Sequence, residues 1–297
     1  MAFINIFVTK NAYVSVKNNQ LFLESNGLKV DYPLEDINSI MIENLETTIS
    51  TYTLSQFAQK GILTFICDKE HTPCGIVLPY CQHYQTLNQY NLQVNASKPL
   101  IKQIWQSIIK NKIHNQNIVL NIFGGKDKLL DLKQSVLSGD TTNNEASASL
   151  IYFKELFGKN FIRREDNAIN SFLNYGYSII RGFVCRSIVC HGLMPFMGIF
   201  HSNGLNQFNL ADDLIEIFRP VVDYYVKQNL SNEESLTTKI KVQLYNLINI
   251  DVKIDGQKQP VSYAIDLLVQ MYVKCLRENK NVLKQIEIIG LQTHSYE

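Results

Sequence analysis

The chain lacks acidic residues over two long stretches, although its overall charge is nearly balanced. It has 297 residues, with 28 Lys and Arg against 27 Asp and Glu. No Asp or Glu occurs from residue 71 to 126 or from residue 167 to 211. The first stretch carries five lysines among its tyrosines and Trp105. This pattern suits contact with the phosphates of a nucleic acid, but it is equally typical of a solvated helix face.

The chain also lacks long hydrophobic runs. No stretch of about 18 apolar residues occurs, so we expect no membrane-spanning helix and no membrane partner. The first residues have neither a basic start nor a long apolar run, and they do not resemble a signal peptide. We therefore expect a cytoplasmic protein.

The six cysteines include no C-x-x-C pair. Cys67, Cys74, Cys81 and His83 could be combined into a zinc site, but their spacing fits none of the usual structural zinc patterns. We therefore expect reduced, buried cysteines.

The hydrophobic pattern changes near residue 80. Residues 2–80 consist mostly of short alternating runs that predict strands, with a two-residue hairpin turn at Asn18-Asn19. Within them we expect one short helix, capped by Thr53 or Ser55 and ended by Gly61.

After residue 80, apolar residues recur at helical spacing. The predicted helices lie near 82–96, 98–116, 126–138, 143–158, 167–191, 211–228, 233–249 and 260–279, and a small hairpin turns at Asp255-Gly256. The predicted fold class is α+β, with a small N-terminal β-sheet or sandwich domain (1–80) that serves dimerisation and a larger, mainly α-helical catalytic domain (81–297).

The predicted helix at 167–191 is apolar nearly all round and should be buried. Gly176 in its interior suggests close approach of another backbone. We expect Asn170 and Asn174 to join a hydrogen-bonded core network. Tyr175 and Tyr177, with Arg163 and Arg164 just before the helix, could instead line a groove for a phosphodiester chain.

Three carboxylates follow the second acid-free stretch at once: Asp212, Asp213 and Glu216, close behind His201. If residues 210–226 are helical, spacings of three and four residues place these carboxylates on one face. A cation, either Arg219 or a divalent metal, would relieve their repulsion. Alternatively, they simply complement the dipole of a helix start, with Asp212 as a solvated first-turn residue.

Three motifs occur in order: NEASASLIYFKELFG, INSFLNYGYSIIRGFVCRSIVCHGLMPFMGIFH and FNLADDLIEIFRP, between residues 144 and 220. Together they resemble the signature of the CRISPR adaptation integrase, the first CRISPR-associated protein family, in the forms encoded beside a single-protein RNA-guided effector. The resemblance implies a β domain joined to a helical catalytic domain.

The resemblance also implies a metal-binding and catalytic triad of Glu145, His201 and Glu216, with Asp213 and Asn209 in support. Two carboxylates and an imidazole suit Mg²⁺ or Mn²⁺. For DNA contacts we expect seven residues: Arg163, Arg164, Tyr175, Tyr177, Arg181, Arg186 and Arg219.

The activity implied by the resemblance is integration of short foreign DNA into a CRISPR repeat array, by attack of a 3′-hydroxyl on a phosphodiester. With water as the nucleophile the same site would act as an endonuclease. Expected partners are double-stranded DNA, a second copy of the chain, and the small second CRISPR-associated protein, which would bridge two dimers. Further candidate partners are other adaptation proteins and the RNA-guided effector. Two alternatives are a DNA-binding subunit whose catalysis has decayed and a metal phosphohydrolase acting on small molecules.

Overall fold

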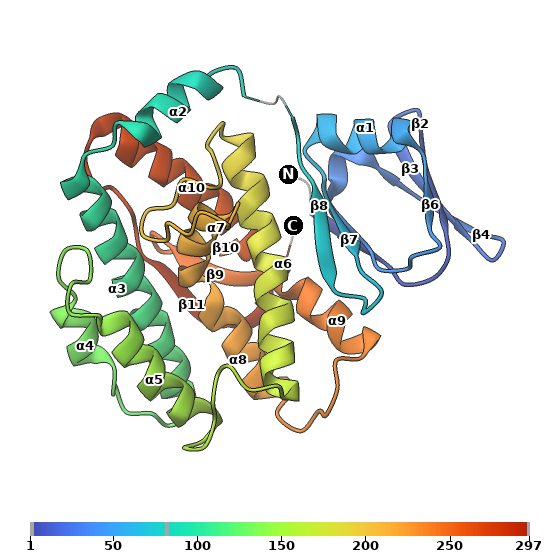
Figure 1. The fold of residues 1–297 in the computed structure, drawn as a ribbon. Coiled ribbons are helices and arrows are strands. Elements are labelled where there is room, and N and C mark those ends of the chain that lie inside the picture. The colour runs from blue at the N-terminus through green and yellow to red at the C-terminus, as the bar shows by residue number, and fades with distance from the viewer. Residues whose placement is uncertain (1–2, 81–82, 296–297) are drawn as a thin grey trace. The chain divides into compact units, whose positions relative to one another are not determined.

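The computed structural model describes residues 3–80 and 83–295. These residues form two compact units, one ending at Tyr84 and the other beginning at Gln85. Strands dominate the first unit and helices dominate the second (Figure 1). The α+β class expected from the sequence is therefore confirmed.

The first unit contains two four-stranded sheets. One sheet has the order β1-β5-β7-β8, with the first three strands parallel, and the other has the order β4-β3-β2-β6. The strands are β1 (Ile4–Val8), β2 (Tyr13–Lys17), β3 (Gln20–Ser25), β4 (Leu28–Pro33), β5 (Ile37–Ile42), β6 (Thr48–Ile49), β7 (Leu63–Cys67) and β8 (Pro73–Val77). A 3₁₀ turn, η1 (Leu34–Asp36), precedes β5, and helix α1 (Thr51–Lys60) precedes β7.

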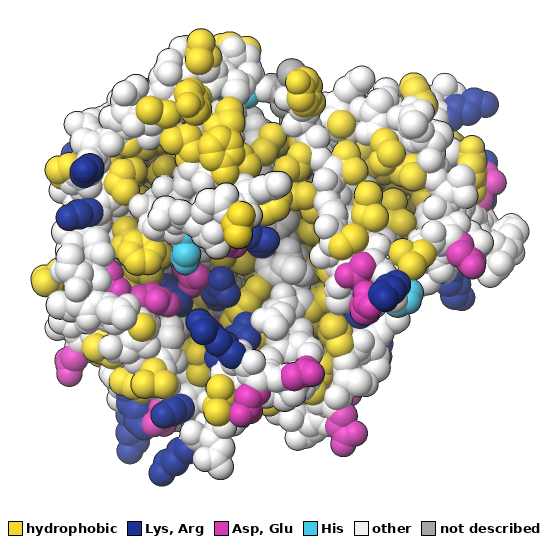
Figure 2. All heavy atoms as spheres, in the orientation of Figure 1, with side chains coloured by type: hydrophobic (Ala, Val, Ile, Leu, Met, Phe, Trp, Pro, Cys, Tyr) yellow, Lys and Arg dark blue, Asp and Glu magenta, His cyan; other side chains and the backbone are white. Residues whose placement is uncertain are grey.

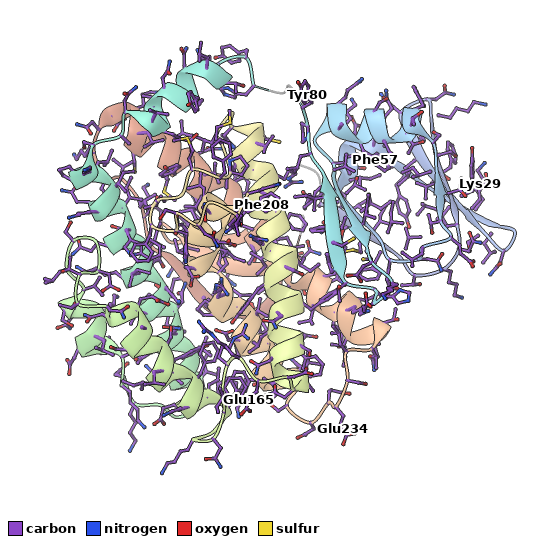
Figure 3. All side chains as sticks on the ribbon, in the orientation of Figure 1. Lys29, Phe57, Tyr80, Glu165, Phe208 and Glu234 are labelled. Carbon is purple, nitrogen blue, oxygen red and sulfur yellow. The ribbon has the colours of Figure 1, made fainter. Side chains whose placement is uncertain are left out.

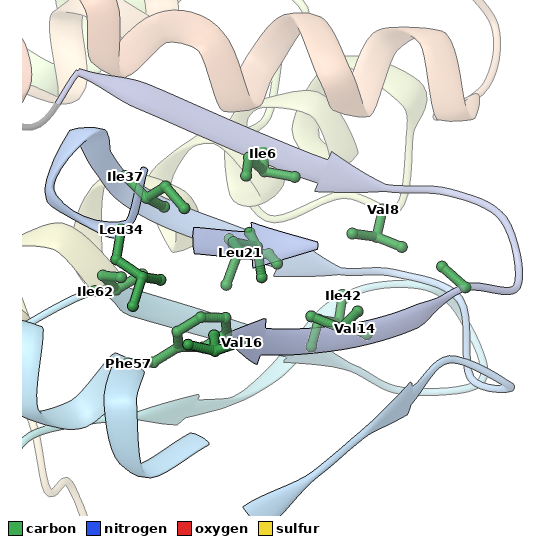
Figure 4. Packing of buried hydrophobic residues seen from close by; sticks show 12 residues of the cluster. Ile6, Val8, Val14, Val16, Leu21, Leu34, Ile37, Ile42, Phe57 and Ile62 are labelled. Carbon is green, nitrogen blue, oxygen red and sulfur yellow. The ribbon is translucent and has the colours of Figure 1, made fainter. Parts of the chain in front are cut away.

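Both sheets share one hydrophobic core (Figure 4). Ile6 from β1 and Ile40 from β5 meet Val14 from β2 and Leu21 from β3 there. Phe57, which Figure 3 labels on α1, is fully buried in the same cluster. Alternation along β2 explains this arrangement, because successive side chains of a strand point to opposite faces.

The predicted turns of this unit are confirmed, but the predicted helix cap is wrong. Asn18 and Asn19 have positive φ angles of 51° and 59° between β2 and β3. The N-cap of helix α1 is Ser50, three residues before Thr53, and its hydroxyl accepts the backbone N–H of Thr53 at 3.1 Å. Gly61 ends the helix with a φ of 68°, as expected.

The structure describes five of the six cysteines. Cys67, Cys185 and Cys275 are buried as expected, whereas Cys74 is exposed. Cys81, part of the zinc combination considered above, lies outside the described residues.

The second unit is a helical assembly with one small sheet (Figure 1). Its helices are α2 (Thr86–Val94), α3 (Lys98–Ile122), α4 (Leu130–Ser135), α5 (Asn144–Phe157), α6 (Ala168–Cys190), α7 (Asn209–Leu214), α8 (Arg219–Asn229), α9 (Thr238–Tyr245) and α10 (Val261–Glu278), with 3₁₀ turns η2 (Ile215–Ile217) and η3 (Asn246–Asn249). Within the described residues, none of the helices combines the length and apolar character needed to cross a membrane.

An antiparallel sheet of order β10-β9-β11 completes this unit. Its strands are β9 (Ile250–Ile254), β10 (Gln257–Pro260) and β11 (Ile286–Thr293). The hairpin predicted at Asp255-Gly256 is confirmed by positive φ angles of 51° and 81°. Strand β11 was not expected from the sequence.

The single helix predicted over 211–228 is wrong, because α7, η2 and α8 divide that stretch. Pro220 stands in the first turn of α8. A proline ring clashes with the carbonyl four residues earlier, here that of Glu216, and it has no N–H to donate. The helix is therefore interrupted at Glu216, and this carboxylate does not share one helix face with Asp212 and Asp213 as the continuous helix would have required.

Helix α6 is the buried helix that the sequence predicted. A Cβ added at Gly176 would lie 2.4 Å from Cγ1 of Val222, so the element that approaches this glycine closely does so with a side chain and not, as expected, with its backbone. Asn170 is buried and donates to the carbonyls of Ile162 and Glu165, as expected for a core network. Asn174 is exposed, and its side-chain oxygen accepts from Arg163.

Candidate metal and DNA site

Two of the three predicted triad residues meet at one lysine. The ammonium of Lys112, from α3, donates to Glu145 at the start of α5 and lies 2.6 Å from Oε2 of Glu216 in η2. The Lys112 side chain is only 7% exposed. Carboxylates separated by 71 residues of sequence therefore share one buried cation.

Asp140 positions Glu145 through the backbone. Its two carboxylate oxygens accept the N–H groups of Asn144 and Glu145, at 2.9 and 3.0 Å. These N–H groups belong to the first turn of α5, which has no partners for them within the helix. Ser149, one turn further on, donates its hydroxyl to Oε1 of Glu145 at 3.3 Å.

Glu216 lies between two cations. Nε of Arg219 is 2.9 Å from its Oε1, opposite the contact with Lys112. Burial alone would raise the pKa of Glu216, but the charges of Arg219 and Lys112 outweigh burial and hold this pKa below its ordinary value. Burial likewise opposes the charge on Lys112, yet Glu216 and Glu145 raise the pKa of that ammonium. Both groups are therefore charged at neutral pH.

His201 is held by Asp213, which is fully buried. Nδ1 of His201 lies 2.6 Å from Oδ1 of Asp213, and the same carboxylate accepts the backbone N–H groups of Ile199, Phe200 and His201. The hydrogen bond to Asp213 raises the pKa of His201. With a proton on Nδ1, Nε2 is the nitrogen that can bind a metal, as in carboxylate–histidine–metal arrangements.

The loop before α7 is fixed by Asn209. Its buried amide donates to the carbonyls of Phe196, Asn203 and Asn206 at 3.0–3.2 Å. These contacts hold the two ends of the loop that carries His201, which agrees with the supporting position expected for Asn209.

The side chains of Glu145, Glu216 and His201 are of the kinds that bind a divalent cation, but they are not gathered around a common point. Across 3–80 and 83–295, no three His, Cys, Asp or Glu side chains are grouped closely enough to hold a metal ion. Glu145 and Glu216 instead converge on Lys112, while His201 is oriented by Asp213. Two carboxylates and an imidazole suit Mg²⁺ or Mn²⁺. The group that lies where the carboxylates converge is the ammonium of Lys112.

A cavity of about 410 Å³ adjoins the two carboxylates. Arg163, Arg164, Arg219 and Tyr177 line it, together with Lys112, Gln116, Glu145, Ser149, Phe153, Glu216 and Asp223. Figure 2 shows dark blue and magenta side chains side by side in a hollow of the helical unit. Four of the predicted DNA-contacting residues therefore line the same cavity as Glu145 and Glu216, two of the three predicted metal ligands, whereas His201 is not part of this lining.

The tyrosine ring of Tyr177 organises the basic wall of this cavity. The guanidinium groups of Arg219 and Arg163 lie 4.6 and 5.2 Å from its ring centre. The hydroxyl of Tyr177 donates to Asp223, which is buried. Burial raises the pKa of Asp223 to about 6, although the hydrogen bond from Tyr177 acts in the opposite direction.

The other three predicted DNA contacts lie outside this cavity lining. Arg181 is bound to Asp212, with Nε to Oδ1 at 2.6 Å and Nη2 to Oδ2 at 2.9 Å, and it stacks on Phe208, labelled in Figure 3. Arg186 packs over Phe183, and Tyr175 is buried. The expectation that Asp212 is a solvated first-turn residue is wrong, because the bidentate contact with Arg181 is more favourable than hydration alone.

Sequence reasoning missed Lys112, Asp140 and Asp223 as parts of the site. Lys112 was counted with the basic residues of the acid-free stretch, yet it is flanked by the buried Ile108, Ile109 and Ile113. A lysine on the apolar face of a predicted helix was the available signal, since a buried lysine needs a carboxylate partner.

The fold and the site together define a protein with a β unit and a helical unit that carries paired carboxylates, a carboxylate-bound histidine and an arginine-lined cavity. The family model described as CRISPR associated protein Cas1 matches residues 6–244. The chain belongs to the Cas1 family.

Known relatives agree with this membership. The chain is 38% identical over 306 residues to the CRISPR-associated endonuclease Cas1 of Neisseria meningitidis serogroup C (strain 8013), with 100% of both chains covered. It is 26% identical to a CRISPR-associated endonuclease Cas1 of Francisella tularensis subsp. novicida (strain U112), covering 81% of this chain and 84% of the relative.

Solved structures share the fold. A casposase bound to its integration product has a TM-score of 0.76 at 20% identity, covering 95% of this chain and 92% of the other. A Cas1 protein from Thermotoga maritima has a TM-score of 0.70 at 18% identity, with 93% and 97% covered.

Proposed function

We propose that this chain is a divalent-metal-dependent DNA integrase and endonuclease that inserts short foreign DNA into a CRISPR repeat array. The observation that carries the proposal is the convergence of Glu145 and Glu216 beside a cavity lined by Arg163, Arg164 and Arg219. Support also comes from the relative in Neisseria, named a CRISPR-associated endonuclease, and from the casposase seen with its integration product.

In this proposal Glu145, Glu216 and Nε2 of His201 hold Mg²⁺ or Mn²⁺. The bound ion would lower the pKa of the attacking 3′-hydroxyl and stabilise charge developing on the phosphate. Asp213 holds His201 in the tautomer that presents Nε2. A new bond forms between the 3′-oxygen and phosphorus, and the bond to the 3′-oxygen of the cut repeat strand breaks.

The arginines have a separate role, which is to bind the phosphodiester. Guanidinium groups match phosphate oxygens in geometry and charge. Arg163 and Arg219 are held over the Tyr177 ring, so fewer rotamers are lost when DNA binds. Binding should weaken steeply with salt because counterions are released from the DNA.

The proposal includes assembly. Two copies of the chain would form a dimer through the β unit, and the small second CRISPR-associated protein would bridge two dimers on double-stranded DNA in the cytoplasm. Association with that second protein is supported by a structure described as a Cas6-RT-Cas1–Cas2 complex, one chain of which matches 96% of this chain over 36% of its own length, with a TM-score of 0.70. Other adaptation proteins and the effector are further candidate partners.

The test is a strand-joining assay on a hairpin-ended repeat substrate, with a labelled short duplex, Mn²⁺ or Mg²⁺, and the small partner protein present or absent. The proposal predicts labelled product with metal and none with a chelator. Turnover of free nucleotides that DNA does not inhibit would support a small-molecule phosphohydrolase instead. DNA binding without joining under any metal would support a decayed subunit.

A further inference from the structure

The ammonium of Lys112 lies where the two predicted metal-binding carboxylates converge. It donates to Glu145 and is 2.6 Å from Oε2 of Glu216. A divalent ion bound by both carboxylates would need to lie between them. The lysine and the ion therefore compete for the same position.

The local charge explains why both cannot stay. Glu145 and Glu216 contribute two negative charges, and Lys112 and Arg219 contribute two positive charges, so the group is neutral. A divalent ion would add two positive charges next to a buried ammonium. Two positive charges in contact repel each other strongly in a buried site, where little water screens them.

The cavity provides a place for the displaced side chain. Lys112 already lines the 410 Å³ space that Arg163, Arg164 and Arg219 surround. The four methylene groups of a lysine allow its ammonium to swing while the stem stays packed. Arg219 has less freedom, since its guanidinium is held over Tyr177.

We infer that Lys112 is a built-in counter-ion of the metal-free site, which holds Glu145 and Glu216 together and must leave before a divalent ion binds. This inference rests on the proposed function, because it takes Glu145 and Glu216 as metal ligands. Lys112 thereby weakens metal binding in the absence of DNA. Its release places a fourth positive charge in the cavity, where a phosphodiester would bind.

The test is titration calorimetry of the metal-stripped full chain with MnCl₂. Lys112→Met should bind Mn²⁺ about tenfold more tightly than the wild type, because the ion no longer displaces a buried ion pair. Lys102→Met is the matched control, since Lys102 is exposed on the same helix, and its Mn²⁺ affinity should equal that of the wild type. Equal or weaker Mn²⁺ binding by Lys112→Met overturns the inference.

A third variant separates this inference from the proposed function. Glu216→Gln should lower Mn²⁺ affinity about tenfold or more if Glu216 is a ligand. If Glu216→Gln binds Mn²⁺ as the wild type does, the proposed metal site itself is wrong. If it loses affinity while Lys112→Met shows no gain, only the role of Lys112 is wrong.

A measurement on the wild type covers the case in which Lys112→Met does not fold. Acylation of lysine amines, followed by peptide mass spectrometry, reports how accessible each ammonium is. Labelling of Lys112 should rise several-fold when Mn²⁺ is added, while labelling of Lys102 stays constant. Unchanged or reduced labelling of Lys112 under saturating Mn²⁺ contradicts its displacement.

Discussion

The two compact units differ in what they bury. The core of the β unit is a cluster of aliphatic side chains and Phe57, and Glu43 is the charged residue buried in its described part. The helical unit buries Lys112, Asp213, Glu216 and Asp223 within and around one cavity. Burying charge costs free energy unless the charges are paired, so such groups concentrate where chemistry requires them. The buried charges of the second unit lie at and around the site for which we propose catalysis, whereas the core of the first unit is mainly aliphatic.

The largest expected effect follows from removing a carboxylate charge in the helical unit. Glu145→Gln and Glu216→Gln should each reduce strand joining about a thousandfold or more, because the proposed metal ion would lose a ligand. Glu43→Gln in the β unit removes a buried carboxylate too, and it should leave the joining rate within about twofold of the wild type. The amount of product formed in the hairpin-repeat assay measures the joining rate of each variant. Similar losses in all three variants would show that the two units do not differ in this respect.

The next effect concerns the aliphatic core. Phe57→Ala should lower the free energy of unfolding by about 3–5 kcal/mol, since it removes a fully buried ring and leaves a cavity. Tyr52→Ala on the same helix is the control and should change it by less than about 0.5 kcal/mol, because Tyr52 is exposed. Urea denaturation measures both, and a small loss for Phe57→Ala would refute the view of this core as the stabilising element.

A smaller, pH-dependent effect should appear at Asp223. Its pKa is about 6 in the folded protein, above the ordinary value of 3.8, so the folded state binds more protons between these pH values. Stability due to this group therefore falls by about 2 kcal/mol as pH rises from 4 to 6.

Asp223→Asn removes that titration. Between pH 4 and pH 6, the free energy of unfolding should therefore fall less for the variant than for the wild type. Urea denaturation at both pH values gives the difference. Parallel pH profiles for the two proteins would show that the pKa of Asp223 is not raised in the folded protein.

The smallest effect concerns the helix cap. Ser50→Ala should destabilise the β unit by about 1 kcal/mol, because the N–H of Thr53 loses its acceptor. Ser55→Ala should cost less, since its hydroxyl only donates to the carbonyl of Tyr52 within the helix. Thermal unfolding distinguishes the two variants. A larger loss of stability for Ser55→Ala would support Ser55 as the helix cap, as expected from the sequence.

The fold class, the hairpin turns and the buried helix α6 could all be predicted from the sequence. These features depend on local rules: alternation of apolar residues, the positive φ of Asn18-Asn19 and Asp255-Gly256, and an apolar surface all around residues 168–190. The motif resemblance also identified the family, which the family comparison confirmed.

The pairing of the charges could not be predicted from the sequence, because it depends on the assembled fold. Lys112, Glu145 and Glu216 come from three separate elements, and no local pattern links them. Glu216, where Pro220 interrupts the helix, pairs with Lys112 and Arg219. Asp212 pairs with Arg181 instead. Ion pairing depends on which side chains packing brings within a few ångströms of each other, and that distance is set by the assembled helices rather than by spacing along the chain.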